Sequence, residues 1–288
     1  MRLGDGPSDN FEDRTGSTGG MGFGGNMLGC LLPLVASRFG IVGVLILLLG
    51  YCALTQFGGG GGLLPSGTKT SAPSAKSTLS AENRRILVGT LESTDSVWAK
   101  IFAASGARYT EPRLVAYTQG TQTGCGYGQA AAGPFYCPND AAIYVDPAFF
   151  SELSRRFGAP GDAAAAYVIA HEVGHHVQNL QGALTQANQL QARASKTEGN
   201  AIQVKVELQA DCYAGVWAAS ARDSQGSILE AGDAQEAMGA AEAVGDDTLQ
   251  KQSQGYVVPD SFTHGSSAQR IAAFQKGLQS GDPKACAA

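Results

Sequence analysis

The chain has 288 residues, with 20 Lys and Arg against 25 Asp and Glu, a net charge of −5 and no basic run. That length gives room for one sizeable domain or two small ones, and the acidic balance argues against nucleic acid as a partner. None of the six cysteines forms a CxxC pair, which argues against a thiolate zinc site or a thioredoxin-like centre.

The first part of the chain does not have a globular composition. Residues 1–37 are polar and rich in Gly up to about Asn26, and they hold too few apolar side chains to build a core, so we predict a disordered tail. The stretch from Phe39 to Phe57 then contains no charge over about 19 residues, roughly the length that crosses a bilayer. We therefore predict a transmembrane helix over residues 38–57 and a protein attached to the cell membrane by one span.

The charges beside the predicted span suggest its orientation. Arg38 borders its N-terminal side and favours a cytoplasmic tail, while Lys69 and Lys76 on the other side weaken that bias. The cysteines of the large C-terminal region favour placing that region outside the cytoplasm. Residues 58–79 begin with five glycines and continue with Ser, Thr, Pro and Lys. They predict a flexible linker, after which the folded domain is expected over residues 80–288.

The predicted domain combines short strands with helices. Ser80 is expected to start a helix, and residues 95–104 give a second helical piece. Residues 113–118 and 141–145 have the composition of strands, and the Gly-rich stretch 120–133 between them that of a loop. Helical patterns follow. This order predicts a small α+β domain.

One predicted helix carries the sequence HEVGH. It runs over AAAAYVIAHEVGHHVQ, with Asp162 as a suitable N-cap before it and Gly182 as a suitable stop after it. His171 and His175 are four residues apart, so their rings lie on one face of the helix, one turn apart. Two imidazoles at this spacing can bind one zinc ion.

Glu172 lies beside this pair, where its carboxylate can act as general base for a zinc-activated water. The alternative is a chance HExxH on a solvated helix, but the flanking residues are apolar. Two histidines and a glutamate buried there without a metal would be costly. His176 projects about 100° away from His175 and is expected to be a packing or hydrogen-bonding residue, not a ligand.

Zinc needs a third protein ligand. One solution, HExxHxxGxxH, is excluded because Gln178 and Gln181 replace its Gly and last His. A glutamate from a later helix is the other, and Glu207 in VELQADCYAGVWAA is the strongest candidate, with Glu198 a weaker one. Glu207 and Asp211 lie on one helix face, where two like charges need a cation between them. Asp211 would then orient a ligating histidine; alternatively both acids pair with Lys205 or Arg222 or face water.

His264 is the one histidine outside HEVGHH and lies in a Gly/Ser loop, SFTHGSSAQR, with Arg270 six residues later. A lone histidine is often structural. A His or Arg at this place could instead stabilise the oxyanion on an attacked carbonyl, so His264 is a catalytic candidate and Arg270 a candidate transition-state stabiliser.

The motifs HEVGHHVQ, ELQADCYAGVWA, GPFYCPNDAAIYVD, SFTHGSSAQR and SDNFEDR resemble those of a bacterial family of neutral zinc metallopeptidases with one membrane segment. The HExxH and ExxxD pair resembles the gluzincin arrangement of thermolysin and the CAAX-processing peptidases. The resemblance implies Zn²⁺ held by His171, His175 and Glu207, Glu172 as general base and Asp211 as support for a ligand. It also implies a minimal zincin fold, in which a small antiparallel sheet lies over the active-site helix and its edge strand can hold a peptide.

The sequence thus predicts a membrane-anchored zinc peptidase that acts on proteins or peptides. A catalytically silent zinc-stabilised binding module and a zinc amidase acting on cell-wall peptides stay open as alternatives. The substrate, the cleavage preference and the oligomeric state do not follow from the sequence.

Four cysteines lie in the predicted domain, and counting alone leaves their pairing open. Cys125 and Cys137 flank the Gly-rich loop, which a bridge would order. Cys212 and Cys286 would tie the C-terminal tail to the helix of Glu207. We predict these two disulfides.

Overall fold

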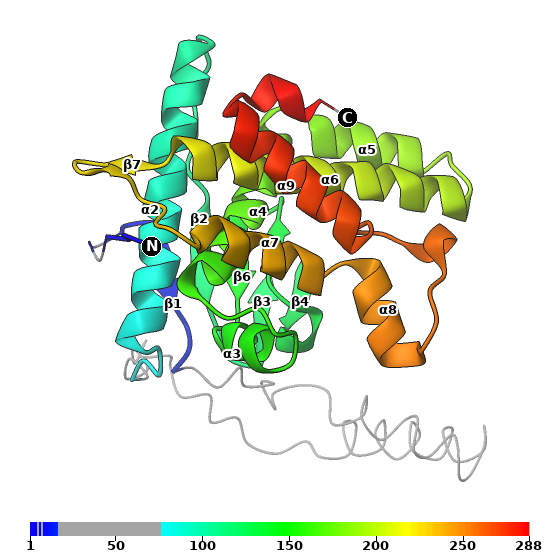
Figure 1. Ribbon diagram of the computed structural model, residues 1–288, viewed down its shortest axis with the longest axis horizontal. Helices are drawn as coiled ribbons and strands as arrows, with labels where there is room; N and C mark the ends of the chain where they lie inside the picture. Colours follow the sequence, from blue (N-terminus) through cyan, green and yellow to red (C-terminus); the bar gives the residue numbers. More distant parts are fainter. Residues whose placement is uncertain (5, 7, 17–75, 288) are drawn as a thin grey trace, which may run out of the picture. The chain divides into compact units, whose positions relative to one another are not determined.

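The computed structural model describes residues 1–4, 6, 8–16 and 76–287 (Figure 1). Within this part the chain is α+β, as predicted. The helices are α2 (Ala81–Ala104), α3 (Ala148–Arg155), α4 (Asp162–Leu180), α5 (Ala183–Gln191), α6 (Lys196–Ser220), α7 (Asp233–Ala243), α8 (Asp246–Gln254) and α9 (Ser267–Ser280). The strands are β1 (Phe11–Asp13), β2 (Arg113–Ala116), β3 (Gly120–Thr123), β4 (Gly126–Gln129), β5 (Phe135–Cys137), β6 (Ala142–Val145), β7 (Arg222–Asp223) and β8 (Gly226–Ser227).

The main sheet has four strands in the order β1-β2-β6-β5. β1 runs parallel to β2 and β2 parallel to β6, while β5 alone is antiparallel to its neighbour. The prediction of an antiparallel sheet is therefore wrong. The two central strands, RLVA and AIYV, are largely apolar and buried, as expected for parallel strands covered on both faces.

Side chains of β2 alternate between two cores. Leu114 and Ala116 join a cluster that includes Ile169, Val173 and Val177 of α4 together with apolar residues of α2. Val115 lies on the other face, in a cluster with Tyr144 and Cys137. The sheet thus holds α4 against one face, and α4 carries the HEVGH motif.

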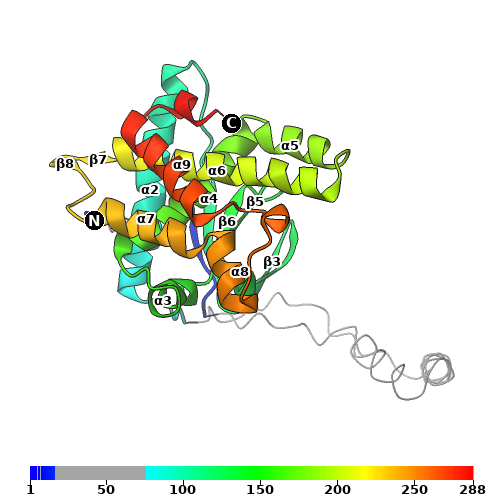
Figure 2. The same cartoon turned by 45° about the vertical axis from the view of Figure 1, so that its right-hand side comes forward.

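The helices on the far side of α4 pack through small residues. α9 lies along α6 in both views (Figure 1, Figure 2). A Cβ atom on Gly277 would lie 1.9 Å from the carbonyl oxygen of Cys212, and one on Gly215 would lie 2.1 Å from that of Phe274. Only glycine allows two helix backbones to approach this closely. α9 therefore packs closely against α6, the helix that carries Glu207.

The first residues of the chain are part of this domain, so the prediction of a disordered tail over residues 1–37 is wrong for the described residues 8–16. β1 pairs with β2, and the ends of the pairing are closed by hydrogen bonds from the Leu114 amide to the Asn10 carbonyl and from the Arg14 amide to the Ala116 carbonyl. Thr78 also donates two hydrogen bonds of 3.1 Å to Thr15, from its amide to the Thr15 hydroxyl and from its hydroxyl to the Thr15 carbonyl. These backbone bonds stabilise a segment whose composition has little apolar surface.

The predicted transmembrane helix, residues 38–57, lies outside the described residues. Among the residues that the structure describes, no helix is both long and apolar enough to cross a membrane. Over the described residues the fold class is α+β, and this part of the chain holds no membrane-spanning helix, which corrects the predicted fold class.

Two predicted elements differ in detail from the structure, and both predicted disulfides are present. The two predicted N-terminal helical pieces form one continuous helix, α2, capped by Ser80 as expected. The Gly-rich loop over residues 120–133 contains a β3–β4 hairpin. Both predicted disulfides are confirmed, Cys125–Cys137 and Cys212–Cys286.

Candidate metal centre

The HEVGH motif lies inside α4, a helix that is buried over most of its length. Its N-cap is Gly161 rather than Asp162, which is the first helical residue and places its charge in the first turn. The helix ends at Leu180, and Gly182 adopts the left-handed conformation, with φ of 77°. The predicted stop at Gly182 is thus confirmed.

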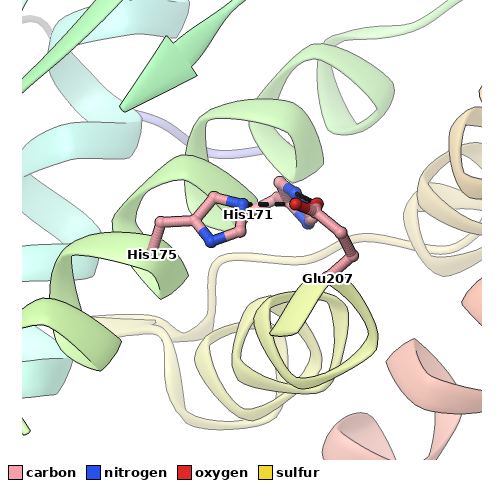
Figure 3. A group of neighbouring side chains, drawn as sticks. All are labelled: His171, His175 and Glu207. Atoms are coloured by element: carbon pink, nitrogen blue, oxygen red, sulfur yellow. Dashed lines mark hydrogen bonds and ion pairs between the residues drawn. The ribbon is translucent and has the colours of Figure 1, made fainter. Parts of the chain in front are cut away.

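Three side chains from α4 and α6 converge (Figure 3). The Nε2 atom of His171 lies 3.1 Å from Oε2 of Glu207, and Nε2 of His175 lies 3.3 Å from the same oxygen. One ligand atom of each residue falls within 4.8 Å of the others. The three predicted ligands therefore meet at one point, although His171 and Glu207 lie 36 residues apart in the chain.

Asp211 lies on the other side of the His171 ring. Its Oδ1 atom is 2.8 Å from His171 Nδ1 and accepts a 2.5 Å hydrogen bond from the Tyr167 hydroxyl. Arg270 donates two hydrogen bonds of 2.9 Å to the same carboxylate, from Nε and Nη2. Asp211 is fully buried, and its charge is balanced by Arg270. The carboxylate thus fixes Nδ1 as the protonated nitrogen and turns Nε2 of His171 toward Glu207.

Two further contacts fix Glu207. Gln203 donates a 2.7 Å hydrogen bond to Oε1, one turn back on α6, which leaves Oε2 facing the histidines. The helix itself is held close to α4, because a Cβ atom on Gly174 would lie 3.0 Å from the Cα atom of Ala210. A larger residue at 174 would move Glu207 away from the histidines.

The charges of the site act on one another strongly. Burial opposes the charge on His171, but the Asp211 carboxylate outweighs it and raises the pKa of His171 to about 10. Burial also opposes the charge on Asp211, yet Arg270 and His171 hold its pKa at about 2. Despite burial, the charge of His175 and hydrogen bonds from His171 and His175 lower the pKa of Glu207 well below its usual range. The site therefore keeps two ionised carboxylates and must release protons when it binds a metal.

This donor set fits zinc. Two imidazole nitrogens and one carboxylate oxygen are the ligands of one common class of catalytic zinc site, in which the fourth position stays open. Both imidazoles have their Nδ1 atoms occupied, by Asp211 and by Gln178, so both present Nε2 to the metal. A cation bound by both Nε2 atoms and by the Glu207 carboxylate would balance the charge of this buried acid.

Glu172 lines the cleft that opens from this centre, a cavity of about 640 Å³. Its side chain is mostly buried, and its charge acts on His175. Phe135 and Tyr136 of β5 also line this cleft. A carboxylate therefore lies next to the metal position in a space large enough for part of a peptide.

His264 also lines the cleft, and its side chain is half exposed. Its Nδ1 atom lies 3.1 Å from Oδ1 of Asp246, and Oδ2 of Asp246 accepts the amide hydrogens of Thr263, His264 and Gly265. Asp246 thus fixes both the loop and the ring. Arg270 is placed differently: its guanidinium points to Asp211, Tyr167 and the Val244 carbonyl, which favours a supporting role over contact with a transition state.

His176 faces away from the metal position, as predicted. Its Nε2 atom donates to the Thr110 carbonyl at 2.6 Å, and its Nδ1 atom accepts from the Tyr136 hydroxyl at 3.0 Å. Asn179 donates a second bond to that hydroxyl. Burial lowers the pKa of His176. The residue joins α4 to β5 and so fixes one wall of the cleft.

Several residues of the site were not predicted from the sequence: Tyr167, Gln178, Gln203 and Asp246. Tyr167 lies four residues before His171 on an otherwise apolar helix, and that polar group was a usable signal. Asp246 had none, because acids at a helix start are common. Glu198, the weaker ligand candidate, forms a capping box with Ser195 at the start of α6 and lies away from the centre.

Comparison with known proteins agrees with this geometry. Residues 2–288 match the family described as "Putative neutral zinc metallopeptidase", which implies Zn²⁺ as the cofactor. The chain is 44% identical to the uncharacterized protein YpfJ of Escherichia coli strain K12 over 97% of this chain and 95% of that protein. It is also 44% identical to the uncharacterized protein Rv2575 of Mycobacterium tuberculosis, over 69% of this chain and 68% of that one. No solved structure matches the chain.

Proposed function

The chain belongs to the neutral zinc metallopeptidase family, and we propose that it hydrolyses peptide bonds with one zinc ion held by His171, His175 and Glu207. The observation that carries this proposal is the convergence of both histidine Nε2 atoms on one oxygen of Glu207. Three protein ligands and an open cleft are typical of a catalytic site, whereas structural zinc sites are closed by four.

A bound zinc ion supplies a Lewis acid that polarises a carbonyl and makes water acidic near neutral pH. Glu172 follows a ligand on α4 and lines the cleft, so its carboxylate is placed to accept a proton from the attacking water. The water oxygen bonds to the carbonyl carbon, the carbon–nitrogen bond breaks, and Glu172 returns the proton to the leaving amine. His264, held by Asp246, is proposed to donate a hydrogen bond to the developing oxyanion.

The substrate side of the cleft is a strand edge. In the described part of the chain β5 pairs on one side, with β6, and Phe135 and Tyr136 line the cleft. An extended peptide can add to such an edge through main-chain hydrogen bonds. We propose that the substrate lies along β5 with its scissile carbonyl toward Glu172.

The two disulfides of the domain support a location in an oxidising compartment outside the cytoplasm. We therefore propose that the domain lies outside the cytoplasm.

Mass spectrometry of a peptide library tests the proposed activity on the full chain. We expect cleavage by the zinc-loaded protein, loss of cleavage after chelation and recovery when zinc is restored. Glu207→Ala is the matched control, because it removes one ligand and should cleave nothing at the same total zinc. Cleavage of cell-wall peptides alone would favour the amidase. Zinc binding without any cleavage would favour the silent binding module and refute the proposed activity.

A further inference from the structure

Gln178 lies one turn after His175 on α4 and contacts the far side of its ring. Its Oε1 atom is 2.9 Å from His175 Nδ1, and the side chain is completely buried. At this position the sequence departs from HExxHxxG, where a glycine would stand. Gln178, which replaces the glycine of that motif, therefore contacts the zinc ligand His175 directly.

One backbone carbonyl fixes the orientation of the Gln178 amide directly, and a second fixes it through Gln209. Its Nε2 atom donates to the Val206 carbonyl at 2.7 Å and to Oε1 of Gln209 at 2.9 Å. The Gln209 Nε2 atom donates in turn to the Cys286 carbonyl at 3.3 Å. Backbone carbonyls only accept hydrogen bonds, so turning either amide over would place two acceptors against each other.

The orientation of the amide decides which histidine nitrogen carries the proton. Oε1 of Gln178 is an acceptor, so His175 must keep its hydrogen on Nδ1 to satisfy it. The lone pair of Nε2 is then free and faces Glu207. His171 is oriented by the Asp211 carboxylate, whereas His175 is oriented by a neutral amide that α6 holds in place.

We propose that Gln178 is the positioning residue for His175, and that it holds this imidazole in the orientation and tautomer in which Nε2 binds zinc. The inference rests on the proposed zinc site. It adds a link between the two ligand helices, because Val206 precedes Glu207 on α6. A shift of α6 that moves Glu207 would thus also move the partner of His175.

Zinc affinity of the full-length protein tests this role, measured by competition with a chromophoric chelator. Gln178→Leu keeps the approximate size of the side chain and removes the acceptor. The Kd for zinc should therefore rise by about 10- to 100-fold. Gln178→Glu keeps an acceptor for His175 but loses both donors to α6. It should bind zinc nearly as tightly as the parent. Gln186→Leu, the same change at an exposed position of α5, is the matched control and should leave the affinity unchanged.

Thermal melting of the metal-free variants separates positioning from mere folding. Gln178→Glu should melt lowest, because its carboxylate faces two acceptors. If Gln178 only supports the fold, zinc affinity will follow this melting order and Gln178→Glu will bind more weakly than Gln178→Leu. That result, or parent-like affinity of Gln178→Leu, overturns the inference.

The His175→Ala variant distinguishes this failure from failure of the proposed function. If His175→Ala binds zinc as well as the parent, the zinc site itself is misassigned and both proposals fall. If His175→Ala loses zinc while Gln178→Leu does not, the zinc site stands and the role of Gln178 alone is refuted.

Discussion

Arg270 reaches Asp211 from 59 residues away and donates to both of its carboxylate oxygens, each at 2.9 Å. Both side chains are buried. The pair lies behind His171, so the carboxylate that orients a zinc ligand has its own charge balanced inside the protein. Such a pair is costly to break from one side, because the remaining charge stays buried without its partner.

We therefore expect Arg270→Met to lower the free energy of unfolding by about 3–5 kcal/mol. Urea unfolding of the metal-free protein measures this. In the Asp211→Asn background the same substitution should cost much less, because no buried carboxylate is left unpaired. Equal costs in the two backgrounds would show that the two side chains are not energetically coupled.

Asp95 predicts a pH dependence of stability. It is buried on α2 and accepts a 2.8 Å hydrogen bond from the Tyr109 hydroxyl. Burial raises its pKa to about 7, and the Tyr109 hydrogen bond only partly opposes this. Because the folded pKa lies above the unfolded value of about 3.9, the fold favours the protonated acid. That stability is complete below about pH 3.9 and is lost as the pH rises toward 7.

Asp95→Asn keeps an acceptor for Tyr109 and cannot ionise. Its stability relative to the parent should rise by roughly 2–3 kcal/mol between pH 5 and pH 8, as measured by urea unfolding at each pH. Glu82→Gln changes an exposed acid of the same helix and serves as control, with a difference that does not vary over this range. A constant difference for Asp95→Asn would contradict the prediction.

The zinc motif could be predicted because its geometry is local. His171, Glu172 and His175 lie within two turns of one helix, and helical spacing alone puts the two rings on one face. Glu207 and Asp211 share a face for the same reason. Two acids on one apolar helix also indicated a nearby cation, and this was the reason to place α6 beside α4.

What the sequence did not predict depends on contacts between distant segments. β1 has one large apolar side chain, Phe11. It pairs with β2, about 100 residues later in the chain, through backbone hydrogen bonds. Backbone hydrogen bonds do not depend on residue type, so this pairing cannot be recognised from composition. The same holds for the direction of β2 and β6, because parallel pairing is decided by the connection between strands. The contact of Arg270 with Asp211 could not be predicted, because only the packing of α9 on α6 brings the two side chains together.

The docking of β1 predicts that Phe11 contributes to stability. Phe11 is partly buried, packs against the core cluster of α2 and the sheet, and lies under the guanidinium of Arg84. Phe11→Ala should lower the free energy of unfolding by about 1–2 kcal/mol, less than the cost at a fully buried site. Asp9→Ala, an exposed neighbour, should change it by less than about 0.5 kcal/mol. Equal effects would mean that the segment does not dock in solution.

His264 and Asp246 predict a loss of turnover without loss of metal. His264→Ala should lower kcat by about 10- to 100-fold if the ring donates to the oxyanion, at or below the usual cost of losing one such donor. Asp246→Asn should have a smaller effect in the same direction, because the loop amides keep an acceptor. Zinc content, measured by atomic emission, should equal that of the parent in both. A change in KM alone would assign His264 to substrate binding.

Glu172 should be needed for the reaction and not for the metal. It lines the cleft beside the ligands, and its Oε atoms make no hydrogen bond within the described residues, so replacing it breaks no contact that holds the fold. Glu172→Gln keeps the size and shape of the side chain and removes its basicity. Without a base to take the proton of the attacking water, turnover should fall by at least about 100-fold, while zinc content and Tm stay near those of the parent. His175→Ala is the informative contrast, because it should lose turnover and zinc together. If Glu172→Gln cleaves a substrate as fast as the parent, another group takes the proton and the role proposed for Glu172 is wrong.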